Sequence, residues 1–239
     1  MKKKLLLNAI LWISIFSSFQ FLRENSVPEV KIVAPDSVGR FAWNTLVPFR
    51  ISVNDKEDGN SEYDEINRNE VLLTVQYLNN SSKVKDYLAQ NIEKNQKILS
   101  WIGSSSCFTC HAAKEKLIGP SFSEISEKYG ENLKQTDGLV EKIKHGAKGV
   151  WGDQIMPAHP NLDPDDLKEA VEWILTISSD PGFSFYAGTE GAFRTQKEPT
   201  DQKGEGVYVL RAHYSDKGID GKINTYKTGS DTVIIKCAN

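Results

Sequence analysis

The chain has 239 residues, a length that predicts one or two domains with hydrophobic cores of their own. Its 29 Lys and Arg against 32 Asp and Glu give a net charge of −3, which leaves no basic excess for binding nucleic acid. Hydrophobic residues at 39% and charged residues at 26% exclude a polytopic membrane protein and are typical of a soluble fold.

The first predicted element is a secretory signal peptide. Lysines at positions 2–4 precede an apolar run over residues 5–16, and charged residues begin again at Arg23. A basic segment followed by an apolar segment of this length is the layout of an export signal. We therefore predict that residues 1–22 are removed and that the mature protein is periplasmic or secreted. The alternative is that this segment stays uncleaved and anchors the protein in a membrane.

Residues 27–80 are expected to form β-strands. Apolar and polar residues alternate over 47–53 and 71–77, as in strands with one buried face, and 30–33 is a third candidate. An acidic turn at 55–60 separates two of these strands. Calcium binding at this turn is a lesser alternative, because the turn lacks the ligand spacing of an EF-hand loop.

Helical patterning extends over residues 95–179, after a linker predicted at 81–94. The clearest helix follows Asp163, whose carboxylate can accept hydrogen bonds from the first backbone N–H groups. Pro164 suits the first helical position, and apolar residues recur on one face up to Leu175 of a helix predicted to end at Ser178. This segment is therefore expected to be an all-α domain.

Residues 183–239 return to β patterning. The candidate strands lie at 183–186, 207–214 and 232–235. Three strands bury little apolar surface by themselves. Two architectures follow: one sandwich formed by both β segments with the helical domain inserted between them, or two separate small β modules.

A Cys-x-x-Cys-His sequence lies in the helical region at residues 107–111. This is the attachment pattern of c-type haem. Thiols three positions apart reach two vinyl groups on one porphyrin edge, and the adjacent His111 reaches the iron. A zinc site would need a second ligand pair, and the third cysteine, Cys237, lies in the β pattern. The sequence thus predicts one haem c attached through Cys107 and Cys110.

A second axial ligand of the iron has to come from the remaining methionine and histidine side chains. Apart from Met1, Met156 is the sole methionine, and it lies in a predicted loop between two helical segments, followed by a proline. His145 and His159 lie in the same region, whereas His213 belongs to a predicted strand. The position of Met156 favours it, with His159 as the rival.

Residues 95–179 resemble a small bacterial class I cytochrome c domain, which has an all-α fold. The resemblance rests on the haem motif, Gly119-Pro120, Trp151-Gly152, Met156-Pro157 and a final helix at 164–178. It implies His111 and Met156 as axial ligands and a hydrogen bond from His111 to the Pro120 carbonyl. It also implies that Trp151 lies near a haem propionate.

The first helix of this region departs from the family pattern. A class I cytochrome c usually has a small residue where its first helix crosses its last one. Here that neighbourhood holds Ile98, Trp101 and Ile102. The packing of the two helices is therefore expected to differ in detail.

The flanking segments resemble known modules more loosely. Residues 47–77 are similar to PKD-like modules of the immunoglobulin fold. Residues 206–218 look like the β segment that follows cytochrome domains in multidomain secreted bacterial proteins, some of which also carry a quinoprotein sugar dehydrogenase. The fold predicted is multidomain: an all-α class I cytochrome c domain with all-β, immunoglobulin- or PKD-like segments on either side.

These features predict an exported monohaem electron carrier. A His/Met pair closes the coordination sphere of the iron, which favours electron transfer over peroxidase chemistry, so we do not expect an enzyme. The implied partners are redox proteins, such as a quinoprotein dehydrogenase as donor and an oxidase or another cytochrome as acceptor. The alternative is an interaction or scaffold protein whose β module docks on a dehydrogenase or a polysaccharide, with the haem as a tethered relay.

Overall fold

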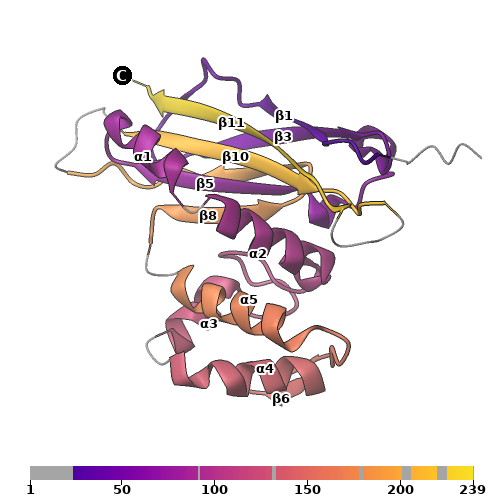
Figure 1. The fold of residues 1–239 in the computed structure, drawn as a ribbon. Coiled ribbons are helices and arrows are strands. Elements are labelled where there is room, and N and C mark those ends of the chain that lie inside the picture. The colour runs from indigo at the N-terminus through magenta and orange to yellow at the C-terminus, as the bar shows by residue number, and fades with distance from the viewer. Residues whose placement is uncertain are drawn as a thin grey trace, which may run out of the picture.

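The computed structural model has β-strands above a group of helices (Figure 1). It describes residues 24–90, 92–130, 133–177, 180–200, 206–219 and 225–238. The predicted signal peptide at 1–22 lies outside these ranges. Among the helices within them, none has the length and apolarity needed to cross a membrane. We call residues 92–177 the helical part, and the strands on either side of it the β part.

Two sheets make up the β part. The first contains β1 (Glu29–Ala34), β3 (Leu46–Asp55), β4 (Gly59–Asn60) and β9 (Glu190–Arg194). The second has the order β2 (Arg40–Phe41), β11 (Thr228–Cys237), β10 (Val207–Ser215), β5 (Leu72–Leu78) and β8 (Phe183–Ala187). Strands from the two β segments pair as β3 with β9 and as β5 with β8 and β10. Both sheets therefore combine strands from before and after the helical part.

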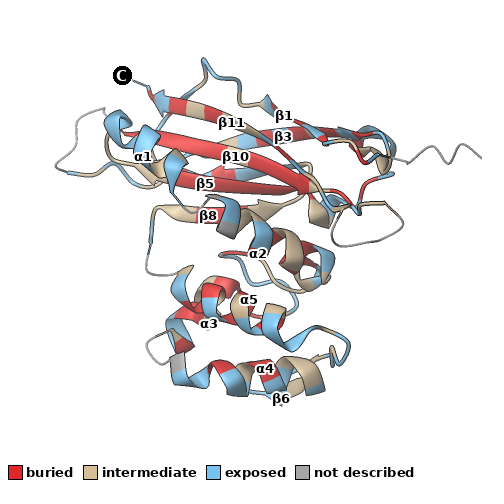
Figure 2. Cartoon of the chain, in the orientation of Figure 1, coloured by how far each residue is buried: buried red, intermediate tan, exposed pale blue. Residues whose placement is uncertain are grey.

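One apolar core lies between the two sheets. The alternation predicted for β3 buries Phe49, Ile51 and Val53, which share a cluster with Leu210 and Tyr214 of β10 in the other sheet. β5 and β10 are buried along most of their length (Figure 2). Since successive side chains of a strand point to opposite faces, a strand buried throughout must be covered on both sides. The second cover is the helical part.

Within its described residues, the helical part contains four α-helices and a hairpin. They are α2 (Ile92–Ser104), α3 (Phe122–Tyr129), α4 (Thr136–His145), α5 (Pro164–Thr176) and the strands β6 (Ala147–Gly149) and β7 (Gly152–Met156). The cap predicted for the last helix is present, because Asp163 accepts hydrogen bonds from the N–H groups of Asp165 and Asp166. Short 3₁₀ turns lie at Ser61–Tyr63, Arg68–Glu70, Ser81–Lys83, Cys107–Thr109 and Leu133–Gln135.

Two segments differ from the sequence-based expectation. The span 81–94, expected to be a linker, contains the helix α1 (Val84–Ala89) and the first residues of α2. The segment before Met156, expected to be a loop, forms the β6–β7 hairpin, whose strands are mostly exposed. Exposed strands show no alternation of apolar and polar residues, so the usual sequence signal is missing there.

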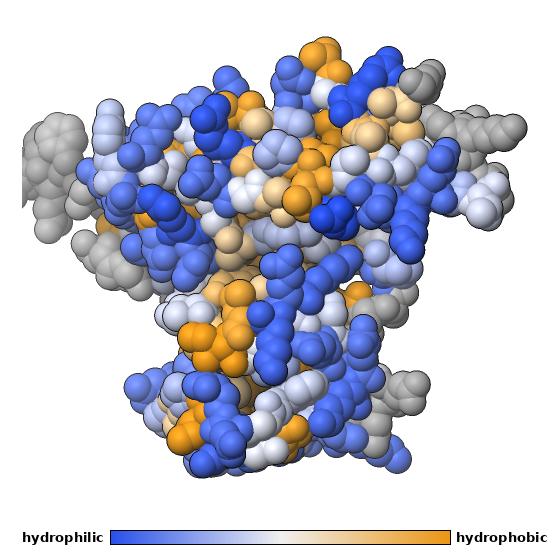
Figure 3. Space-filling view, turned by 180° about the vertical axis from the view of Figure 1, so that it is seen from behind, coloured by the Kyte–Doolittle hydropathy of each residue, from blue (hydrophilic) through white to orange (hydrophobic). Residues whose placement is uncertain are grey.

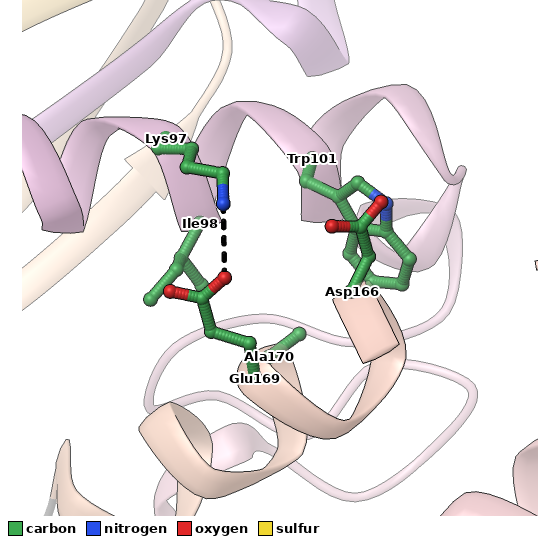
Figure 4. Close-up of a pocket in the computed structure, with 6 residues that line it drawn as sticks. All are labelled: Lys97, Ile98, Trp101, Asp166, Glu169 and Ala170. Carbon is green, nitrogen blue, oxygen red and sulfur yellow. Dashed lines mark hydrogen bonds and ion pairs between the residues drawn. The ribbon is translucent and has the colours of Figure 1, made fainter. Parts of the chain in front are cut away.

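The small residue at the crossing of α2 and α5 comes from α5. Ala170 is buried beneath Ile98 of α2, and both line a small cavity with Trp101 (Figure 4). Lys97 Nζ lies 3.0 Å from Glu169 Oε2 at the edge of this contact. The bulky Ile98 of α2 therefore packs on the small Ala170 of α5.

The opposite face of α2 packs on the β part. A Cβ added to Gly103 would lie 2.8 Å from the carbonyl oxygen of Asn69, so the backbones approach closely there. Ser100 Oγ is 2.9 Å from Ser215 Oγ of β10, and Leu99 is fully buried. One apolar cluster joins Leu72 and Phe185 of the β part to residues of the helical part, among them Ile98, Leu99, Phe108, Phe122 and Trp173. The two parts thus share a continuous core.

Candidate functional site

A cavity of about 780 Å³ lies in the helical part. It is bounded by all four helices and by the β6–β7 hairpin, and most of its wall is apolar, including Ile102, Phe122, Ile125, Ile143, Leu167 and Val171. Its volume falls within the range of about 300–1,000 Å³ typical of cofactor pockets. All six predicted site residues line it: Cys107, Cys110, His111, Pro120, Trp151 and Met156.

The Cys-x-x-Cys-His motif forms a tight turn directly after α2. Ser106 adopts a left-handed conformation with φ of 62°, and the 3₁₀ turn Cys107–Thr109 follows. The N–H groups of Cys110 and His111 both donate to the carbonyl of Cys107, so the two thiols and the imidazole are held on one short loop. Burial raises the pKa of the Cys107 thiol to about 11, and neither motif cysteine is in a disulfide.

Two contacts fix the ring of His111. Nδ1 lies 2.7 Å from the Pro120 carbonyl oxygen, the hydrogen bond that the resemblance implied. Because Nδ1 donates the proton, Nε2 keeps a lone pair for a metal. Burial lowers the pKa of His111, which favours this neutral form. A Cβ on residue 119 would lie 2.5 Å from His111 Cε1, so Gly119 makes room for the ring.

Met156 is the last residue of β7, and His159 lies just beyond it. The hairpin is close to the end of α4, because a Cβ on Gly146 would lie 3.0 Å from the carbonyl oxygen of Met156. The N–H of His159 donates to the Ile143 carbonyl at 3.0 Å, which ties the chain after Met156 to α4. The structure therefore brings both candidate ligands to the cavity.

The other two candidate histidines lie elsewhere. His145 is exposed at the end of α4, where its Nε2 is 3.1 Å from Glu141 Oε2. His213 is fully buried in β10. Neither lines the cavity.

Trp151 occupies one wall of the cavity in an aromatic and cationic cluster. Its ring meets Tyr129 edge to face at 6.3 Å, and Lys128 Nζ lies 4.5 Å from its centroid. Three further lysines, Lys116, Lys142 and Lys148, line the cavity. Sequence reasoning missed these lysines, because a lysine among many charged residues carries no distinctive signal.

The residues of the cavity fit a haem c. The apolar walls suit the macrocycle, and the lysines suit its two propionate carboxylates. The thiols of Cys107 and Cys110 can form thioethers, and His111 offers an unprotonated Nε2 to the iron. Hydrophobic residues also reach the surface of the helical part among hydrophilic ones (Figure 3). The calcium alternative concerned the acidic turn at 55–60. Within the described ranges, no group of three His, Cys, Asp or Glu side chains lies close enough together to hold a metal ion, at this turn or elsewhere.

The amino-acid sequence matches one protein family and several of its members. Residues 101–178 match the family described as cytochrome c. Cytochrome c-552 of Nitrosomonas europaea is 37% identical over 73 residues, which cover 30% of this chain and 71% of that protein. Cytochrome c-551 of Azotobacter vinelandii is 41% identical over 73 residues, which cover 30% of this chain and 88% of that protein. The crystal structure of wild-type Nitrosomonas europaea cytochrome c552 aligns with 36% identity and a TM-score of 0.31, covering 32% of this chain and 94% of that one.

Proposed function

The chain belongs to the cytochrome c family, and we propose that it is an exported monohaem carrier of single electrons between periplasmic or cell-surface redox proteins. Covalent haem c is the cofactor of this family, and Cys107 and Cys110 stand at its attachment positions. The observation that carries the proposal is that both thiols, His111 and Met156 line one apolar cavity.

We assign His111 and Met156 as the residues that would hold the haem iron. When bound, the haem would supply an iron able to alternate between Fe(II) and Fe(III). The Pro120 carbonyl orients His111 through Nδ1, and the thioether of Met156 is a soft ligand that favours Fe(II) and raises the reduction potential. With both His111 and Met156 bound, the iron would have no free position for peroxide, which supports a carrier and not an enzyme. Trp151 and the neighbouring lysines would face the propionates.

Export is proposed from residues 1–22, whose pattern is that of a signal peptide. In that compartment a quinoprotein dehydrogenase is a suitable electron donor, and an oxidase or another cytochrome a suitable acceptor. A scaffold protein with a tethered haem is the less favoured alternative, because α2 packs directly on β5 and β10 through buried side chains.

Covalent attachment is the property to test first. The full chain, expressed with a cytochrome c maturation system in an exporting host, should keep its pigment after acid–acetone extraction. The Cys107→Ala/Cys110→Ala double variant should yield almost no stable pigmented protein. Cys237→Ala is the matched control, because Cys237 lies at the end of β11 and should leave attachment unchanged. Pigment that is extracted from the wild type, or retained by the double variant, would contradict the proposal.

A further inference from the structure

The wall of the haem cavity behind His111 is built in two layers, and the outer layer comes from the β part. The inner layer is Phe122, the first residue of α3, whose ring stacks on the His111 ring with centroids 5.4 Å apart and planes at 28°. The outer layer is Phe185 in the middle of β8, whose centroid is 5.8 Å from that of Phe122. Phe122 and Phe185 are 3% and 2% exposed, so the two rings are buried against each other.

Phe185 also contacts the haem-attachment motif itself. Phe108, which lies between the two cysteines, has its centroid 6.0 Å from Phe185 and 5.9 Å from Phe122. On the far side Trp173 of α5 closes the group at 5.4 Å from Phe185. Among the described residues of the β part, Phe185 is thus the one ring that touches both the stacking partner of His111 and the motif loop.

The sheet holds Phe185 in place. β8 pairs with β5 through five residues, with Phe185 opposite Thr74 in the register. Tyr186, the next residue, packs on the core between the sheets, which fixes the direction of Phe185 toward the helices. A close-packed interior transmits such a constraint, because no ring in the group can move without a neighbour moving.

From this geometry we infer that Phe185 is a positioning residue for the proximal haem ligand, that it acts through Phe122 on His111, and that the β part thereby contributes to setting the reduction potential. The inference rests on the proposed role of His111 as an axial ligand. The apolar shell around a metal site controls the orientation of its ligands and the access of water, and both affect the potential. Removing the ring of Phe185 would leave a cavity behind Phe122, loosen the His111 ring and admit water, which stabilises the more highly charged Fe(III) state.

The experiment compares the Phe185→Ala and Phe193→Ala variants of the full-length haem protein. Phe193 is the matched control: it is 1% exposed, but lies in β9 against Tyr208, in the core between the sheets. In Phe185→Ala, the ratio of oxidised to reduced protein at a fixed ambient potential should rise several-fold. The hyperfine-shifted NMR signals of the haem methyls and His111 should also move. Phe193→Ala should lose stability and leave both readouts unchanged.

Two further variants test the route. Phe185→Leu keeps most of the apolar volume and should restore most of the wild-type potential, whereas Phe185→Val removes more of the ring volume, should shift the potential in the same direction as Phe185→Ala, and stands in if the alanine variant does not fold. If Phe185 acts through Phe122, the shifts in potential caused by Phe185→Ala (or Phe185→Val) and Phe122→Leu should be non-additive in the double variant. Additive shifts, or a Phe185→Ala potential equal to that of Phe193→Ala, would overturn the inference. A wild-type chain without covalent haem would instead refute the proposed function, so the two failures are distinguishable.

Discussion

At the scale of single residues, the chemistry of the site follows from a short stretch of chain. Cys107, Cys110 and His111 lie within five consecutive residues, and the 3₁₀ turn Cys107–Thr109 suffices to bring them together. The second ligand of the iron is not determined by such a local motif. Met156 and His159 both line the cavity, and the sequence allows either of them as the ligand.

We expect Met156→Ala to keep its covalent haem and to change its spectrum. Loss of the thioether should remove the weak sulfur-to-iron charge-transfer band of the oxidised protein and open the iron to carbon monoxide or cyanide. The reduction potential should fall by at least about 59 mV, which is a tenfold change in the redox equilibrium for one electron. His159→Ala should leave the spectrum and the potential unchanged. If His159→Ala lost the low-spin spectrum while Met156→Ala kept it, the assignment would be reversed.

His213 should make the folded protein less stable in acid. Burial lowers its pKa to about 3, the charge of Arg211 acts in the same direction, and a contact with the backbone of Gln96 offsets only part of this. An unfolded histidine has a pKa of about 6.5, so below that pH the unfolded state binds the extra proton. The stability is therefore complete above about pH 6.5 and is lost as the pH falls toward 3, by up to about 1.4 kcal/mol per pH unit.

Urea unfolding at several pH values measures this effect. The variant His213→Leu should show a flatter fall of the unfolding free energy between about pH 6 and pH 4 than the wild type. His145→Leu, at an exposed position of α4, is the matched substitution that removes a histidine without disturbing a buried site. Equal slopes in wild type and His213→Leu would show that His213 is not the residue responsible.

At the scale of secondary-structure elements, prediction from sequence succeeded where a local signal exists. The Asp163 cap and Pro164 placed the start of α5, and alternation placed β3 and β5 to within a residue or two. The strands β2, β4 and β9 were not predicted, because two of them have only two residues and β9 has a single buried side chain. The contact of Phe185 with Phe122 was also invisible, since it joins elements that only the tertiary fold brings together.

The crossing of α2 and α5 contains an ion pair and an apolar contact, and we expect the apolar contact to dominate its stability. Lys97 and Glu169 have side chains that are 67% and 37% exposed, so their pair is worth about 0–1 kcal/mol. Ile98 is buried against Ala170, and truncation of such a side chain costs about 2–5 kcal/mol.

The free energy of unfolding of the haem protein should therefore fall by about 2–5 kcal/mol in Ile98→Ala and by less than about 1 kcal/mol in Lys97→Ala. Urea titrations at low and high salt measure both losses of unfolding free energy. Because salt screens an exposed ion pair, the loss in Lys97→Ala should become smaller at high salt, whereas the loss in Ile98→Ala should not change. A Lys97→Ala variant as unstable as Ile98→Ala would mean that the ion pair, and not the packing, holds the crossing.

At the scale of the whole molecule, the arrangement of the two parts could not be derived from sequence. Pairing of β5 with β8 and β10 joins residues separated by the entire helical part, and neither hydrophobic pattern nor turn chemistry specifies such a partner. The span expected to be a linker instead carries α1 and leads straight into α2, which lies on the sheet. The relation of the β part to PKD-like modules stays a prediction that rests on resemblance.

Because the two parts share a core, we expect them to unfold together. Leu72 and Phe185 of the β part are buried in one cluster with Leu99, Phe108 and other side chains of the helical part, so separating the parts would expose all of them. Burial of such side chains contributes roughly 1.5–3 kcal/mol each, which is large beside the 5–15 kcal/mol stability of a typical protein.

Urea unfolding of the haem protein, followed by the haem absorption band and by far-ultraviolet circular dichroism, should give coincident curves with one midpoint. Leu99→Ala, which opens a cavity between α2 and the sheet, should lower the free energy of unfolding by about 2–5 kcal/mol in both signals. Leu139→Ala is the control, because Leu139 lies on α4, away from the sheet, and its truncation removes packing inside the helical part only. Should the wild type show two separate midpoints, the haem would sit in an independent domain, and Phe185 could not constrain His111 through a shared core.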